Sequence, residues 1–172
     1  EKQELWYFTG GPHGGGDSGS AWAALDFAPD TEGCQEATQW VVAAADGLIV
    51  RSGEGAVLQD LDGDGYEQTG WALFYMHIST TDRVQPGAYL RAGDHVGHPS
   101  CEGGFSNGTH LHFARKYNGE WVAADGAIPF NLAGWTMISA GREYDGWLRN
   151  GETQLEACDC RSEINTIKLD GQ

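Results

Sequence analysis

Basic residues are scarce in this chain. Its 172 residues include 10 Lys and Arg against 25 Asp and Glu, so the formal net charge is −15 at pH 7. A surface this acidic repels nucleic acids and anionic membranes. We therefore expect neither as a partner.

Long apolar runs are missing as well. A transmembrane helix needs about 18 or more consecutive apolar residues, and no stretch of the sequence reaches that length. The N-terminus shows no signal-peptide pattern, whereas the four cysteines form an even set that suits an oxidising compartment. These features predict a secreted protein in its mature form, whose leader has been removed or left out. We also expect a monomer.

Helical periodicity is also rare. Short apolar runs rich in Val, Trp, Tyr and Phe alternate with many of the 26 glycines, a pattern typical of antiparallel β structure. We predict an all-β fold, a single antiparallel sheet or β-sandwich-like domain with the active-site cleft on the main sheet and long Gly-rich loops around it. One domain is expected over residues 1–172, with a core at about 6–135 and a C-terminal extension at 136–172. Strands are expected at 40–50, around Val57 and Phe74, at 109–115, and at 121–122 after an Asn118-Gly119 turn.

Four cysteines allow three disulfide pairings. A bridge between Cys158 and Cys160 would close a strained small ring, which favours pairing these two with Cys34 and Cys101. Such disulfides would link the C-terminal extension covalently to the core. The competing option joins Cys34 to Cys101.

The tripeptide His110-Leu111-His112 is the most informative motif. Side chains alternate between the two faces of a strand, so both imidazoles project from one face while Leu111 turns into the core. Two such rings can bind a metal and transfer a proton beside it. Because an exposed strand can also carry two histidines without any function, the rest of the sequence decides.

A catalytic zinc takes three protein ligands and leaves a fourth position for water. His13, in a Gly-rich segment near the N-terminus, is the natural further histidine ligand. Of the carboxylates that follow it, Asp17 lies in a Gly/Ser loop, whereas Asp26 lies in the apolar run 23–28. A carboxylate in an apolar run costs free energy unless it is paired or bound to a metal. This favours Asp26 as the ligand and leaves Asp17 as the alternative.

His77 completes a set of motifs that follow one another in a recognisable order. It ends Tyr75-Met76-His77 in an apolar, strand-like segment, after His13 and Asp26-Phe27-Ala28-Pro29 and before His110-Leu111-His112-Phe113. From about Trp6 to Trp121 this order resembles the lysostaphin- and LytM-type zinc metallopeptidases, which are bacterial cell-wall endopeptidases. The long spacer between His13 and Asp26 is similar to that of the staphylolytic and β-lytic branch.

The resemblance implies a role for each of these side chains. His13, Asp26 and His112 would bind Zn²⁺, and His110 would be the general base. His77 would donate a hydrogen bond to the developing oxyanion or to the metal-bound water. Zinc in such sites lowers the pKa of its bound water to about 7 and polarises the scissile carbonyl. Since ligand histidines must be neutral, activity is expected to fall at acidic pH.

The resemblance also implies a substrate. A zinc endopeptidase of this type would hydrolyse peptide cross-bridges of bacterial peptidoglycan, as a bacteriolytic enzyme. The Gly-rich segment 101–109 suits close approach of a substrate backbone, which favours glycine-containing bonds, with direct diaminopimelate cross-links as the runner-up. The alternative is a catalytically inactive domain of the same fold that binds a wall peptide or a partner.

A second acidic cluster consists of Asp60, Asp62 and Asp64. It resembles the first half of a calcium-binding loop, in which oxygens at positions 1, 3 and 5 meet one cation. The glutamate expected at position 12 would fall on Trp71, so an EF-hand is not predicted. A Ca²⁺ site and a simple hairpin turn are the two interpretations of this loop.

Overall fold

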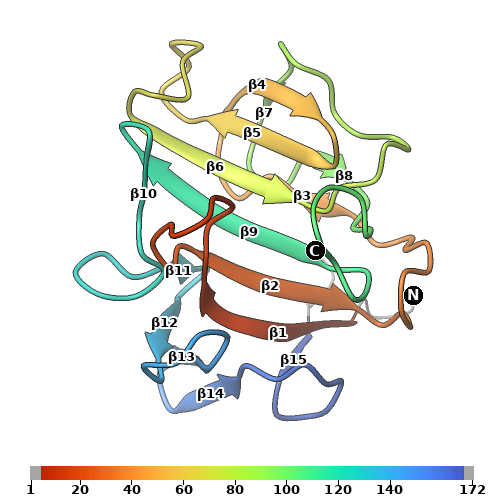
Figure 1. The fold of residues 1–172 in the computed structure, drawn as a ribbon, viewed down its shortest axis with the longest axis vertical. Helices are drawn as coiled ribbons and strands as arrows, with labels where there is room; N and C mark the ends of the chain where they lie inside the picture. The colour runs from red at the N-terminus through yellow and green to blue at the C-terminus, as the bar shows by residue number, and fades with distance from the viewer. Residues whose placement is uncertain (1–4, 169–172) are drawn as a thin grey trace.

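The structure, a computed structural model, describes residues 5–168 (Figure 1). These residues form strands and loops without a helix, and hence without a helical segment able to cross a membrane. Neighbouring strands pair antiparallel in every sheet. The predicted all-β class is confirmed.

Nine strands make up the main sheet. Their order is β15-β1-β2-β9-β6-β5-β4-β7, and β10 pairs with β9. Strands β1, β2, β9 and β6 are therefore direct neighbours, although long stretches of sequence separate them (Figure 1). The strand bounds are β1 Leu5–His13, β2 Ala24–Pro29, β4 Gly47–Gly53, β5 Ala56–Asp60, β6 Trp71–Met76, β7 Tyr89–Leu90, β9 Leu111–Tyr117, β10 Glu120–Trp121 and β15 Thr166–Lys168.

Two smaller sheets accompany the main one. The expected strand at 40–50 is in fact two strands in different sheets, because the chain bends between Ala43 and Asp46 and the Asp46 carboxylate accepts a hydrogen bond from Ala92 N at 2.8 Å. The expected hairpin at Asn118-Gly119 is present, with both residues at positive φ. The smaller sheets are β3 Val41–Val42 with β8 His95–Gly97, and β11 Asn131–Leu132, β12 Trp135–Ser139, β13 Gly146–Asn150 and β14 Thr153–Glu156.

The two faces of the main sheet carry different clusters. The larger core includes Phe8 and Phe113 of the main sheet together with Met137 of the four-stranded sheet. A smaller cluster contains Ala114, the next residue along β9. Because side chains alternate along a strand, His112 lies on the face of Ala114, opposite the large core. The sheet thus buries one face and leaves the other to form a site.

The disulfides join Cys34 to Cys101 and Cys158 to Cys160, with Cα–Cα separations of 5.6 and 5.1 Å. The favoured pairing, in which Cys158 and Cys160 link the C-terminal extension to the core, is therefore wrong. The competing Cys34–Cys101 disulfide is present. The chain bends sharply enough at 158–160 to bring its two cysteines together, and Cys160 N donates a hydrogen bond to Cys158 O at 2.6 Å.

Hydrogen bonds attach the C-terminal segment instead. Strand β15 pairs with β1 at the edge of the main sheet. The Asn165 side chain is fully buried, and its Nδ2 lies 3.2 Å from Phe8 O, 3.0 Å from Cys158 O and 2.8 Å from Cys160 O. A buried amide with such partners fixes the chain that it bonds.

Candidate metal centre and catalytic cleft

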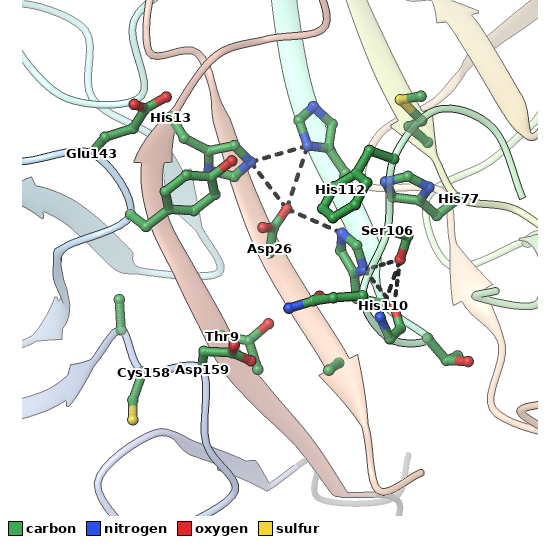
Figure 2. A pocket seen from close by; sticks show the side chains of 18 of the residues that line it. Thr9, His13, Asp26, His77, Ser106, His110, His112, Glu143, Cys158 and Asp159 are labelled. Carbon is green, nitrogen blue, oxygen red and sulfur yellow. Dashed lines mark hydrogen bonds and ion pairs between the residues drawn. The ribbon is translucent and has the colours of Figure 1, made fainter. Parts of the chain in front are cut away.

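A cleft of about 810 Å³ lies on the exposed face of the main sheet. Its floor includes residues of β1, β2 and β9, and its walls come from the loops at 105–110 and 143–145 and from the segment 157–161. Figure 2 shows the five sequence-predicted catalytic and ligand residues gathered in this cleft. They are His13, Asp26, His77, His110 and His112.

Four neighbouring strands bring these residues together. His13 ends β1, Asp26 lies in β2, His112 lies in β9, and His77 follows directly after β6. Asp26 and His112 are paired across the ladder between β2 and β9, so their side chains share one face. His110 precedes β9 and reaches the same carboxylate, with its Nε2 3.7 Å from Asp26 Oδ1.

An irregularity in the pairing of β1 with β2 orients His13. The register shifts on both sides of Gly10, and such bulges redirect the side chains of the bulged strand. A Cβ at Gly10 would lie 2.7 Å from Asp26 Oδ2, so glycine here leaves room for the carboxylate. The bulged end of β1 thus carries His13 to the carboxylate of the next strand.

Three ligand atoms converge at the centre of the site. His13 Nε2 lies 3.0 Å from His112 Nδ1 and 3.2 Å from Asp26 Oδ1. His112 Nδ1 lies 3.4 Å from the same oxygen. The three side chains together could hold one metal ion.

Backbone carbonyls hold the far side of each ring. His13 Nδ1 lies 2.8 Å from Gly11 O, and His112 Nε2 lies 3.1 Å from Gly15 O. A carbonyl only accepts hydrogen bonds, so each of these nitrogens carries the proton of its neutral ring. The two nitrogens that face each other therefore present lone pairs, an arrangement typical of metal-ligating histidines.

The charges of the site favour a cation between these atoms. Burial alone would raise the pKa of Asp26, but His112 and His13 beside it hold the pKa well below its usual range. Burial lowers the pKa of His13, yet the adjacent Asp26 carboxylate outweighs burial and raises this pKa above its ordinary value. The carboxylate stays ionised and draws positive charge toward itself.

The residues fit a divalent metal. Asp26 Oδ1 is buried and has no hydrogen-bond donor, which would cost about 1–3 kcal/mol or more if nothing compensated it. Two imidazole lone pairs point at the same place. Two histidines and one carboxylate form a known ligand set for catalytic zinc.

His77 and His110 lie next to this cluster, with ring centroids 4.4 Å apart. His77 Nδ1 is 2.9 Å from Glu102 O, and His110 Nδ1 is 2.8 Å from Gly108 O. When neutral, both rings are therefore protonated at Nδ1 and carry their lone pair on Nε2. Burial, followed by the charge of His110, lowers the pKa of His77 to about 4. In its neutral form His77 thus presents a lone pair at Nε2, and the role of this ring in catalysis stays a prediction.

Tyr144 belongs to the cleft but was not predicted. Its ring stacks on His13 with centroids 4.3 Å apart, and its backbone is held by a bond from Tyr144 N to Pro12 O at 3.1 Å. Burial, with the charges of Asp26 and Glu143, raises the pKa of its hydroxyl. Tyr144 has φ +67° in a loop of the C-terminal segment, and no local pattern in the sequence marks it.

The alternative ligand Asp17 and the two other histidines of the chain lie outside the metal cluster. Asp17, the alternative ligand, is exposed and accepts a hydrogen bond from Trp121 Nε1 at 2.7 Å. His95 and His98 both pack on the Trp40 ring, with centroids at 4.0 and 3.8 Å, and are absent from the cleft lining.

The acidic loop forms the turn between β5 and β6. The carboxylates of Asp60, Asp62 and Asp64 lie close enough to face one ion. However, the Asp60 carboxylate accepts bonds from Asp62 N at 3.2 Å and Gly65 N at 2.8 Å, as in an ordinary tight turn. Calcium at this loop stays a prediction from the sequence.

Comparison with known proteins identifies the family. Residues 29–124 match the sequence profile of Peptidase family M23. The chain belongs to this family of peptidases. The matched range 29–124 includes His77, His110 and His112, whereas His13 and Asp26 precede it. The resemblance to lysostaphin- and LytM-type metallopeptidases inferred from the motifs is confirmed.

One curated relative and two solved structures show what the chain is similar to. The M23 peptidase is 33% identical to Protease LasA of Pseudomonas aeruginosa over 123 residues, which cover 68% of this chain and 28% of LasA. The chain thus spans less than a third of that relative. Pseudoalterin, an M23 metalloprotease from the deep sea, has the same fold, with a TM-score of 0.73 at 24% identity over 91% of this chain and 92% of its own. The catalytic domain of lysostaphin from Staphylococcus simulans is 25% identical, with a TM-score of 0.48, over 71% of this chain and 89% of its own.

Proposed function

We propose that this M23 peptidase is a secreted zinc endopeptidase that cleaves glycine-containing bonds in peptidoglycan cross-bridges. The observation that carries the proposal is the convergence of His13 Nε2, His112 Nδ1 and Asp26 Oδ1 in an open cleft, with two further histidines beside them. The Cys34–Cys101 and Cys158–Cys160 disulfides favour an oxidising, extracellular setting.

His13, Asp26 and His112 are the proposed zinc ligands. Bound zinc would supply a Lewis acid that polarises the scissile carbonyl and makes water nucleophilic near neutral pH. The protein supplies the carbonyl oxygens of Gly11 and Gly15, which orient the two ligand rings. Hydrogen bonds that orient the ligand rings in this way are typically worth about 10–100-fold in metal affinity or activity.

Proton transfer is assigned to His110. Its Nδ1 proton is held by Gly108 O, so the Nε2 lone pair on the side of Asp26 can accept a proton from the attacking water. As water oxygen bonds to the carbonyl carbon, that proton moves to His110 Nε2. The imidazolium then donates the proton to the departing amine nitrogen while the carbon–nitrogen bond breaks.

Charge on the tetrahedral oxyanion needs a hydrogen-bond donor. Neutral His77 cannot donate from Nε2, because its proton is on Nδ1 against Glu102 O; it serves as an acceptor that orients water or the substrate amide. Tyr144, whose pKa is raised by burial and by nearby carboxylates, keeps its hydroxyl proton at neutral pH and is the proposed donor.

The cleft wall supports a glycine-containing substrate. Gly14, Gly33 and Gly108 line the cleft, and residues without side chains allow a peptide backbone to approach closely. The loop before His110 is held in place by the Cys34–Cys101 disulfide and by a bond of 2.7 Å from Thr109 N to Gly33 O. The approach to the catalytic residues is therefore both open and rigid.

The substrate assignment is tested by product analysis. Zinc-loaded protein is incubated with pentaglycine, with walls that contain glycine bridges, and with walls that contain direct diaminopimelate cross-links. New amino termini are then identified by mass spectrometry, with the His110→Ala protein as the matched control. We expect new glycine amino termini from the first two substrates. Cleavage confined to D-Ala–diaminopimelate bonds would refute the glycine assignment, and no cleavage of any substrate would refute the endopeptidase.

A further inference from the structure

Glu102 lies outside the cleft but contacts a residue inside it. Its backbone carbonyl accepts the Nδ1 proton of His77 at 2.9 Å. His77 is buried, whereas the Glu102 side chain is 41% exposed and is absent from the cleft lining. Any effect of the Glu102 carboxylate on the reaction must therefore act through the position of its own carbonyl.

The Glu102 carboxylate is bound on both oxygens by Thr80. Thr80 N donates to Oε1 at 2.8 Å and Thr80 Oγ1 donates to Oε2 at 2.6 Å. Arg83 Nη1 lies 3.7 Å from Oε2 and also donates to Ile78 O at 3.0 Å. Slight burial would raise the pKa of Glu102, but the bonds from Thr80 and the charge of Arg83 lower it. The carboxylate therefore stays ionised, and hydrogen bonds to an ionised group are the strong ones.

These bonds connect the segment that carries His77 to the segment that holds its ring. Thr80 is three residues after His77, and Ser100 precedes Glu102 by two. Ser100 N donates to His77 O at 2.6 Å, and Glu102 N donates to Ser100 Oγ at 3.0 Å. The contact between His77 Nδ1 and Glu102 O thus has the hydrogen bonds of Ser100 on one side and the bonds between Thr80 and the Glu102 carboxylate on the other.

The local backbone makes this support necessary. His77 has φ +63°, a left-handed conformation that costs a residue with a Cβ about 1–2 kcal/mol. Beyond Glu102 the chain continues through Gly103 and Gly104, both at positive φ, to Phe105, which is 92% exposed. The Cys34–Cys101 disulfide fixes this segment on the N-terminal side of Glu102, and the bonds from Thr80 fix it at Glu102 itself, before the two glycines.

We propose that Glu102 is a positioning residue for His77: the Thr80-bound carboxylate holds the Glu102 carbonyl against His77 Nδ1 and so keeps the Nε2 lone pair directed into the cleft. The catalytic part of this inference rests on the proposed function, because it takes His77 to act in the reaction. The tautomer of the His77 ring can be measured whether or not the protein is an active peptidase.

The first test measures kinetics on the zinc-loaded protein. Glu102→Ala removes both charge-assisted bonds from Thr80, whereas Thr80→Val removes only the one donated by the hydroxyl and keeps the one donated by Thr80 N. We expect kcat to fall about tenfold in Glu102→Ala and by less in Thr80→Val, with KM little changed in both, because the contact acts on the reacting state and not on uniform substrate binding. Thr80→Ser keeps the hydroxyl and should retain wild-type kcat. The double variant Glu102→Ala/Thr80→Val should be no slower than the slower of the two single variants, since both changes disrupt the same pair of hydrogen bonds. Glu67→Ala is the matched control, because it removes a surface carboxylate paired with Arg51 at 3.2 Å.

The second test reads the His77 ring directly. ¹⁵N-histidine spectra of wild-type protein, with His77 assigned from the His77→Asn variant, should show protonated Nδ1 and unprotonated Nε2. Glu102→Ala and Thr80→Val should show a mixture of the two tautomers, while zinc content and melting temperature stay near those of Glu67→Ala. An unchanged tautomer together with unchanged kcat would overturn the proposal, as would a fall in kcat that only follows loss of zinc or of folded protein. A changed tautomer in a protein that hydrolyses no peptide would support the positioning role and refute the proposed function separately.

Discussion

Replacing His110 with alanine is expected to abolish most activity without removing the metal. The His110 ring contacts Asp26 Oδ1 only at 3.7 Å, whereas His13 and His112 lie closer to that oxygen and to each other. Loss of a general base typically costs about 10²–10⁴ in rate. We therefore expect kcat/KM to fall by about that factor while zinc remains at about one ion per chain.

The matched control for this variant is His95→Ala. His95 is exposed and packs on Trp40, outside the cleft, so its removal should change neither zinc content nor rate. Steady-state kinetics and metal analysis on the same preparations decide the outcome. If His110→Ala lost zinc together with activity, His110 would be a ligand and the assignment of roles would be wrong.

Replacing Asp26 with alanine is expected to remove zinc binding. Within residues 5–168, Asp26 is the one carboxylate that contacts both proposed histidine ligands, and its Oδ1 has no hydrogen-bond donor there. Without Asp26, only two imidazoles remain as ligands. We therefore expect zinc affinity to fall by more than the roughly 10–100-fold that is typically lost when a residue hydrogen-bonded to a ligand is removed.

Asp17→Ala is the control for Asp26→Ala, since both remove a carboxylate from the same N-terminal region. Asp17 bonds Trp121 Nε1 at 2.7 Å and is exposed, so zinc affinity should stay near that of the wild type. Zinc titration in competition with a chelating dye measures the zinc affinity of both variants and of the wild type. Equal affinity in wild type and Asp26→Ala, or a loss only in Asp17→Ala, would reverse the choice between the two carboxylates.

Much of the site could be predicted from alternation and polarity. Alternation placed His110 and His112 on one face, and both rings reach the Asp26 carboxylate. The apolar run around Asp26 distinguished it from Asp17, because a charge among buried residues needs a partner. The all-β class followed from short apolar runs separated by glycine.

Other features depend on tertiary structure that no local pattern encodes. Tyr144 comes from a loop of the C-terminal segment and stacks on His13 at the opposite end of the chain. His77 Nδ1 lies against a backbone carbonyl 25 residues away, so the sequence alone could not show which ring nitrogen is turned toward the cleft. The disulfide prediction failed because the argument from ring strain ignored how sharply the chain can bend between Cys158 and Cys160.

Metal analysis of the purified protein, combined with its hydrolytic activity, tests the central claim most directly. Element-specific mass spectrometry should find about one zinc per chain, and removal of the ion by a chelator should abolish peptide hydrolysis, which added Zn²⁺ then restores. Two histidines and a carboxylate can also hold non-haem iron, so the metal must be identified and not only counted. Absence of a bound metal in active protein, or iron in place of zinc, would contradict the account.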